Sequence, residues 1–209
     1  MASQVLVICG DQYHPASDVM SGLAQACRTG VELLQADDAA WLASDESFDA
    51  IVLAKLNVKS PHDPSPWVDE SQEHLLQGFV DSGGGLLVVH AGTVGYQSSP
   101  LIRELTGGAF LHHPETCSVE LTPAAHLLTA GAASFCVHDE HYFVEIDKDV
   151  EVFLTSHSKY GVQPAGWVKT AGRGRICTLT PGHESTVWGQ ESFQRLLHNA
   201  LSWVVGELS

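Results

Sequence analysis

The sequence predicts an α/β protein built on a doubly wound, mostly parallel β-sheet with an antiparallel extension. In the first half of the chain, short runs of almost purely apolar residues alternate with segments of helical periodicity. This alternation is typical of parallel strands that crossover helices bury on both faces. In the second half, strand-like segments follow one another across a glycine-containing turn, which indicates antiparallel pairing. We predict a single domain over residues 1–209, without a linker or repeat.

The first half supplies parallel strands and two helices. The predicted strands are apolar runs over residues 5–9, 31–34, 50–56 and 86–89. Helical spacing of apolar side chains predicts helices over residues 16–28 and 69–82, and three consecutive glycines end the second. Loops after the carboxyl ends of parallel strands line the ligand site of such sheets. We therefore expect three loops to meet at one edge, namely residues 11–15, 57–68 and 90–97.

The second half is less regular. Its predicted elements are a helix over 96–105, a strand over 118–122, antiparallel strands over 151–155 and 165–169, a strand over 175–179 and a closing helix over 193–205. The segment Gly172-Arg173-Gly174-Arg175 could suggest phosphate binding, but its position between two strands favours a hairpin turn. We expect no nucleotide cofactor.

The charge of the chain argues against two classes of partner. A net charge of −15 would be repelled by the phosphates of nucleic acids and by an anionic membrane surface. No run approaches the roughly 20 apolar residues of a membrane span. The first residues lack the basic and apolar parts of a signal peptide, and the five cysteines show no CxxC spacing. We expect a cytoplasmic protein.

Histidines mark the ends of several predicted strands. Among the 12 histidines, His14, His90 and His183 come shortly after apolar strands, whereas His113 and the segment His138-Asp139-Glu140-His141-Tyr142 lie in the irregular middle. Imidazoles and a carboxylate that meet at one edge could bind a divalent metal ion or transfer protons. Four other histidines are expected on the surface, namely His62, His74, His157 and His198.

The segment from Leu86 to Thr93 has the pattern of a nucleophile elbow, in which a strand turns sharply into a helix. The small residues Ala91 and Gly92 let such a turn close. The residue at the tip is His90 and not Ser or Cys, which disfavours covalent acyl transfer. A metal ligand, a general acid/base or a hydrogen-bond donor fits this position better.

Aromatic side chains could line a sugar pocket. Trp67, Trp167 and Trp188 are candidates for stacking against a sugar, whereas Trp41 and Trp203 are expected in the core. The predicted substrate-binding residues are His14, His113, Tyr142 and Trp167.

Six motifs occur in an order that resembles a known family. They are Gly83-Gly-Gly-Leu-Leu-Val-Val-His90, Gly107-Gly-Ala-Phe-Leu-His-His-Pro114, Asp139-Glu-His-Tyr142, Ala165-Gly-Trp-Val168, Gly172-Arg-Gly-Arg175 and Pro181-Gly-His183. In this order they resemble the ThuA-like, or trehalose-utilisation, proteins over essentially the whole chain. The resemblance implies a class I glutamine amidotransferase-like fold, which is flavodoxin-like and has three layers, α/β/α.

The resemblance also implies a scaffold without its nucleophile. The amidotransferases carry Cys where this chain has His90, so we predict that it is not a functional glutamine amidotransferase. Their catalytic His follows a late strand, and the comparable position here is His183, followed by Glu184.

For function, the resemblance implies carbohydrate metabolism. We predict an enzyme that acts on a glycoside or 3-oxo-glycoside by acid/base or metal-assisted lyase or hydrolase chemistry. His90 or His183 would be the base and Glu140 a second acid/base. A divalent ion such as zinc would be held by some of His14, His90, His113 and His183.

Two alternatives stay open. The first is a non-catalytic sugar-binding or accessory protein that works with a sugar oxidoreductase. The second, a residual amidotransferase-type hydrolase, is disfavoured because no Cys occupies the elbow. The expected ligand is a small sugar in each of the favoured cases, and a homodimer is left open.

Overall fold

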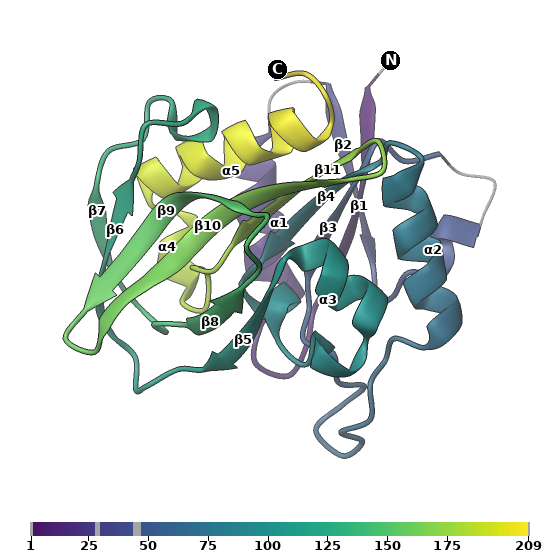
Figure 1. The fold of residues 1–209 in the computed structure, drawn as a ribbon, viewed down its shortest axis with the longest axis horizontal. Coiled ribbons are helices and arrows are strands. Elements are labelled where there is room, and N and C mark those ends of the chain that lie inside the picture. The colour runs from purple at the N-terminus through teal and green to yellow at the C-terminus, as the bar shows by residue number, and fades with distance from the viewer. Residues whose placement is uncertain (1, 28–29, 44–46, 209) are drawn as a thin grey trace.

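The computed structural model describes residues 2–27, 30–43 and 47–208. Within these residues, one sheet of nine strands runs through the molecule (Figure 1). Five neighbouring strands are parallel. In spatial order they are β2 (Val31–Ala36), β1 (Ser3–Cys9), β3 (Ala50–Ala54), β4 (Gly85–Val89) and β11 (Gly174–Leu179). Numbered along the chain, this order is the 2-1-3-4-5 of flavodoxin-like sheets, so the predicted fold class is confirmed.

An antiparallel extension continues the sheet beyond β11, as predicted. It consists of β10 (Gly161–Ala171), β9 (Glu151–Ser158), β6 (Cys117–Pro123) and β7 (Phe135–Asp139). The predicted hairpin turn at 172–174 joins β10 to β11. Three strands were not predicted, because they are short and mix polar with apolar residues: β7, and the separate antiparallel pair β5 (Gly108–His112) and β8 (Phe143–Ile146).

Helices cover both faces of the sheet and make the three layers. On one face, α1 (Ala16–Ala26) and α5 (Glu191–Val204) pack against side chains such as Val5 and Val7. On the other face, α2 (Glu70–Asp81) and α3 (Pro100–Thr106) pack against the alternate side chains, such as Leu6 and Ile8. β1 is therefore apolar at every position of its centre, because successive side chains enter two different cores.

Several predicted boundaries need correction. The helix expected over 96–105 is divided into a short 3-10 helix, η3 (Tyr96–Ser98), and α3, because Pro100 disfavours helical backbone at Ser99 and begins a new helix. β3 ends at Ala54, two residues before the predicted end. The helix predicted to end at Arg28 ends at Ala26, and Arg28 lies outside the described residues. The remaining short helices are η1 (Ala40–Ala43), η2 (His90–Thr93), η4 (Leu127–Thr129) and α4 (Ser185–Trp188).

The tryptophans differ from expectation. Trp41 was expected in the core but is 42% exposed. Trp67, Trp167 and Trp188 are all buried, which leaves their ring faces in contact with protein. Stacking against a sugar needs an exposed ring face, so the prediction that these three residues line a sugar pocket is wrong.

The three loops that were expected to meet do so at the carboxyl ends of the parallel strands. The amide of Leu56 donates to Asp11 Oδ2 at 3.1 Å, and the amide of Asn57 donates to the carbonyl oxygen of Val94 at 3.0 Å. Because β1 leads to β2 on one side and β3 lies on the other, this edge is the topological switch point of the sheet.

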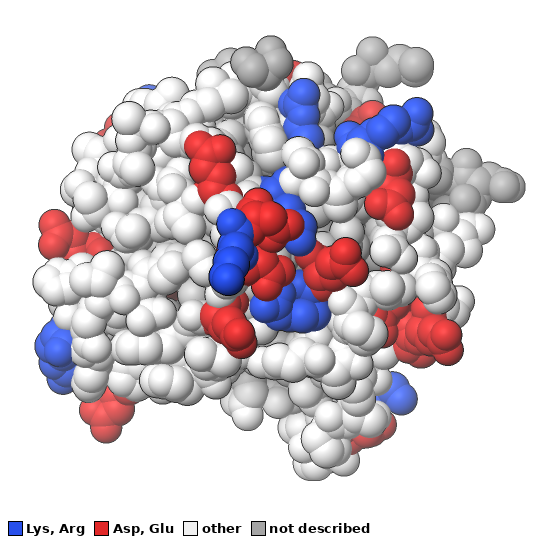
Figure 2. Space-filling model, in the orientation of Figure 1, with Lys and Arg blue, Asp and Glu red and all other residues white. Residues whose placement is uncertain are grey.

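Acidic and basic side chains are interspersed on the face drawn in Figure 2. Lys169 Nζ, for example, lies 3.1 Å from Asp149 Oδ2, and Arg103 forms a bidentate pair with Asp147. In the described part of the chain, no helix combines the length and apolar character needed to span a bilayer.

Candidate functional site

His90 stands at the tip of a sharp turn after β4, as the elbow pattern predicts. Its φ angle is 45°, which makes it the one non-glycine residue with positive φ in the described ranges. Such a backbone costs free energy and persists where the surroundings enforce it, often at functional sites. Gly92 allows the turn, because a Cβ there would collide with the carbonyl oxygen of Leu53. The imidazole of His90 is held almost fully buried above the sheet.

Hydrogen bonds set the tautomer of His90. Nδ1 lies 2.7 Å from the carbonyl oxygen of Thr180, which can only accept, so Nδ1 carries the proton. Nε2 therefore offers a lone pair, and the hydroxyl of Tyr142 donates to it at 2.8 Å. Burial and the neighbouring carboxylates of Glu140 and Asp139 raise the pKa of Tyr142 well above its ordinary value, which keeps it a phenol.

His14 is held in the same way by the loop after β1. Its Nδ1 donates to Asp11 Oδ1 at 2.8 Å, so in the neutral imidazole Nε2 carries the lone pair. Asp11 Oδ1 also accepts the amides of Tyr13 and His14. Burial would raise the pKa of Asp11, but the bonds from His14 and from the amides of Leu56 and Tyr13 lower it overall. A carboxylate behind an imidazole is the arrangement that commonly orients a metal-ligating histidine.

His183 comes from the loop between β11 and α4. The buried carboxylate of Asp139 anchors this loop by accepting the amides of Gly182, His183 and Glu184 at 2.9, 3.0 and 3.1 Å. The His183 Nδ1 atom lies 3.3 Å from Nε2 of His14. Burial lowers the pKa of His183, and the nearby Glu140 only partly opposes this effect.

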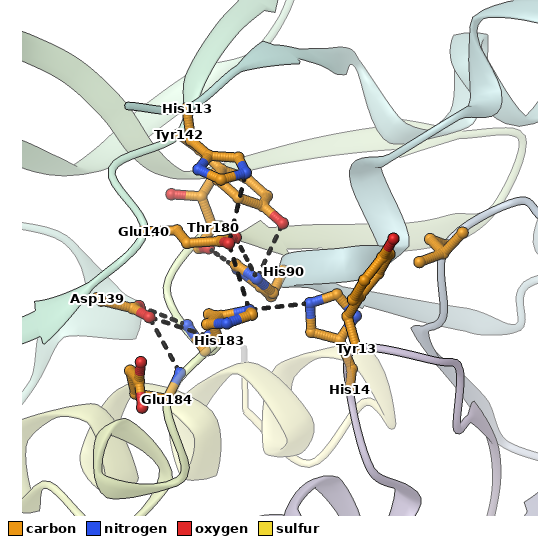
Figure 3. Close-up of polar contacts among 12 residues, drawn as sticks. Tyr13, His14, His90, His113, Asp139, Glu140, Tyr142, Thr180, His183 and Glu184 are labelled. Atoms are coloured by element: carbon orange, nitrogen blue, oxygen red, sulfur yellow. Dashed lines mark hydrogen bonds and ion pairs between the residues drawn. The ribbon is translucent and has the colours of Figure 1, made fainter. Parts of the chain in front are cut away.

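Glu140 lies at the centre of the histidines (Figure 3). Its Oε2 is 3.4 Å from His90 Nε2, and its Oε1 is 3.4 Å from His113 Nε2 and 3.5 Å from His183 Nδ1. Burial would raise its pKa, but the contact with His90 and the positive charge that His90, His183 and His113 carry when protonated lower it overall. The carboxylate is therefore ionised near neutral pH.

His113 differs from the other imidazoles by its place at the rim. Its side chain is 38% exposed, whereas that of His90 is 2% exposed. Its Nδ1 donates to the carbonyl oxygen of Pro114 at 2.8 Å, so in the neutral imidazole Nε2 carries the lone pair and faces Glu140.

Four of these side chains form a candidate metal centre, which consists of His14, His90, Glu140 and His183. One ligand atom from each lies within 4.8 Å of all the others. Imidazole nitrogens with one carboxylate oxygen are a donor set that suits zinc and similar divalent ions. This group contains three of the four predicted ligands together with Glu140, whereas the fourth, His113, lies 3.4 Å from Glu140 at the rim.

Of the other residues named from the sequence, one contacts the candidate metal centre and two do not. Tyr142 contacts His90, as described. Trp167 is 1% exposed, and its indole N–H donates to the carbonyl oxygen of Thr106, so as a substrate-binding residue it is a wrong prediction. His141 is buried, and its two ring nitrogens bond to the hydroxyls of Ser156 and Ser158.

The groups that orient the histidines were not predicted from the sequence. Asp11 and Asp139 were not singled out, although one follows β1 directly and the other precedes Glu140. The carbonyl oxygen of Thr180 carries no sequence signal at all, because every residue has one.

The family model for trehalose utilisation, ThuA, matches residues 4–204. The chain belongs to the ThuA family. This membership gives the protein a carbohydrate-related role, and the predicted family resemblance is confirmed. No curated protein matches the sequence.

Solved structures share the fold of this ThuA-family chain. A putative ThuA-like protein from Parabacteroides merdae has a TM-score of 0.81 at 14% identity, covering 100% of this chain and 91% of that one. Another from Bacteroides uniformis has a TM-score of 0.73 at 18% identity, with 100% and 93% covered. The β-galactosidase from Rahnella sp. R3 has a TM-score of 0.69 at 11% identity, with 97% and 31% covered. In that enzyme, the fold corresponds to about a third of the chain.

Proposed function

We propose that this ThuA-family protein is an enzyme that acts on a glycoside or 3-oxo-glycoside and uses a divalent metal ion such as zinc. His14, His90, Glu140 and His183 would hold the ion. The family supports a carbohydrate as the substrate class. The cytoplasm is the proposed location, because all five cysteines are unpaired, as is typical of a reducing compartment.

One observation carries the metal part of the proposal. His14 and His90 each give their Nδ1 proton to an acceptor within the protein, and each directs an Nε2 lone pair toward Glu140 and its neighbours. A metal ligand needs this unprotonated nitrogen, and the second hydrogen bond fixes the ring orientation. When bound, the ion would polarise a carbonyl or hydroxyl oxygen of the sugar.

His113 is the proposed base. The sequence favoured His90 or His183, with Glu140 as a second acid/base, but all three belong to the candidate ligand set. His113 is outside that set, is the more exposed imidazole and has an unprotonated Nε2. Glu140 Oε1, 3.4 Å away, would stabilise the imidazolium that forms.

For a 3-oxo-glycoside, the proposed reaction is an elimination. The carbonyl at carbon 3 acidifies the hydrogen on carbon 2, and His113 Nε2 accepts that proton. The electrons of the broken C–H bond form the double bond between carbons 1 and 2 as the bond to the anomeric oxygen breaks. The departing oxygen takes up a proton, and later addition of water to the double bond would complete a net hydrolysis.

The metal site can be tested by zinc analysis. Zinc-loaded protein after gel filtration should contain about one zinc per chain, which matches a single set of ligands. We expect His14→Ala and His183→Ala to bind zinc at least about tenfold more weakly, whereas His157→Ala, which changes an exposed histidine of β9, should bind it normally. Equal zinc affinity in all four proteins would refute the site.

The reaction can be tested with 4-nitrophenyl 3-oxo-β-glucoside, from which elimination releases coloured 4-nitrophenolate. We expect His113→Ala to lower kcat by about 100-fold or more with unchanged zinc content, the usual effect of losing a general base. His112→Ala is the matched control, because His112 is its exposed neighbour and stacks on Phe143. Sugar binding without turnover by the wild type would instead favour the accessory-protein alternative.

A further inference from the structure

Tyr13 is an exposed aromatic side chain on an anchored backbone. Tyr13 as a whole is 64% exposed. Its backbone is nevertheless held in place, because its amide donates to Asp11 Oδ1 at 2.9 Å. The same carboxylate oxygen holds Nδ1 of His14 at 2.8 Å. One buried carboxylate therefore positions both the candidate ligand His14 and the backbone of Tyr13.

The ring of Tyr13 lies at the rim of the histidine cluster. Its centroid is 6.4 Å from that of His14, in an edge arrangement with an interplanar angle of 77° (Figure 3). The His14 side chain is 9% exposed, so this one loop leads from the buried centre to an aromatic ring in solvent. Figure 3 places Tyr13 and His113 on different sides of His90.

The fold gives this loop its significance. It follows β1 at the switch point between β1 and β3, where open α/β sheets bind their ligands. An isolated exposed aromatic residue needs no explanation on an ordinary surface. Here the residue combines an anchored backbone, 64% exposure and a position beside the candidate ligand His14.

We propose that Tyr13 is the stacking platform for the sugar, so that the C–H face of a pyranose ring packs on its aromatic face. This inference rests on the proposed function and adds a binding residue to it. It also replaces the tryptophans as the aromatic element of the site, since Trp167 and Trp188 present no accessible ring.

The test is an NMR titration of the zinc-loaded protein with trehalose, maltose and cellobiose. We expect Tyr13→Ala to weaken binding of the sugar that binds the wild type by about three- to tenfold, the usual range for an aromatic contact. Tyr13→Phe should stay within about twofold, because it keeps the ring and loses only the hydroxyl. Tyr160→Ala is the control. Tyr160 is also exposed, at 41%, and lies in the turn between β9 and β10, where Lys159 Nζ lies over its ring.

The outcomes separate this inference from the proposed function. Tyr13→Ala that binds sugar as tightly as the wild type would overturn the platform and leave the proposed function intact. A Tyr13→Phe effect as large as that of Tyr13→Ala would also overturn it, because the hydroxyl would then be the binding group. If the wild type binds none of the three sugars, the platform is refuted, whereas turnover of 4-nitrophenyl 3-oxo-β-glucoside would still support the proposed function. Zinc content should be the same in all variants, which shows that the metal site is undisturbed.

Discussion

At the scale of single residues, the candidate site is a set of side chains whose hydrogen bonds are settled before any ligand arrives. His14, His90 and His113 each commit Nδ1 to an oxygen of the protein. These bonds fix the ring orientations in advance, which lowers the free-energy cost of binding, and only the hydroxyl of Tyr142 must turn away from His90 Nε2 before a metal ion binds there.

Asp139 provides a prediction at this scale. Its buried carboxylate accepts three amides of the His183 loop. In Asp139→Asn the side-chain N–H₂ would face amides that are also donors, so we expect about 1–3 kcal/mol less stability and about tenfold weaker zinc binding. Chemical denaturation and a zinc titration measure the two effects.

The control for Asp139→Asn is Asp147→Asn, which loses a partly exposed ion pair with Arg103. That change should cost less than about 1 kcal/mol and leave zinc binding unaltered. If Asp139→Asn lost stability but bound zinc normally, Asp139 would be a structural residue alone and would not position His183.

At the scale of elements, the turn after β4 combines a strained residue with a glycine that permits it. The carboxyl end of β4 lies beside the carbonyl oxygen of Leu53 in β3, and this leaves no room for a Cβ at position 92. The sharp turn that places His90 over the sheet edge therefore requires glycine at position 92.

We predict that Gly92→Ala destabilises the fold by about 1–3 kcal/mol, as overpacking usually does, and weakens zinc binding by displacing His90. The matched control is Gly78→Ala within α2, where a Cβ would meet nothing within 4 Å. Because alanine favours helix, that variant should gain up to about 1 kcal/mol. Thermal unfolding of both variants measures these changes in stability. A Gly92→Ala protein as stable as the wild type would contradict the close packing of the turn.

The elements also show where sequence reasoning succeeded and failed. β1, β4 and β11 are apolar on both sides because both faces are covered, so their runs identified them and the histidines after them. β5 and β8 form a small two-stranded sheet with few buried positions, so neither apolar runs nor strict alternation marked them. They nevertheless flank His113 and Tyr142, which were predicted from motifs and not from the strands that position them.

At the scale of the whole molecule, the cysteines do not take part in the chemistry that we propose. Cys9 and Cys177 are buried within strands, and none of the five cysteines stands at the elbow tip. Burial raises the pKa of Cys9 to about 11, with the nearby Asp37 as a lesser cause, and burial alone raises that of Cys27 to about 11.

We predict that thiol alkylation leaves activity intact. At pH 8, a thiol with a pKa of about 11 is only about 0.1% thiolate, so Cys9 and Cys27 should react far more slowly than the exposed Cys136. Reactivity of Cys27 should rise as pH increases toward 11, because the thiolate fraction grows. Mass spectrometry after iodoacetamide treatment, with an activity assay on the same sample, tests this. Loss of activity in step with alkylation would revive a cysteine-dependent hydrolase.

The sequence by itself determined the α/β class, the parallel strands and the histidines that follow them. These features can be predicted because a strand buried on both faces needs apolar residues at successive positions, and because the carboxyl ends of parallel strands in a doubly wound sheet meet at one edge. Only the tertiary structure decided that Glu140 and not His113 completes the candidate ligand set, that Trp167 is enclosed, and that Tyr13 is the open aromatic ring. These facts depend on distances between segments far apart in the chain and on which side chains remain in contact with water, and neither quantity has a local pattern in the sequence.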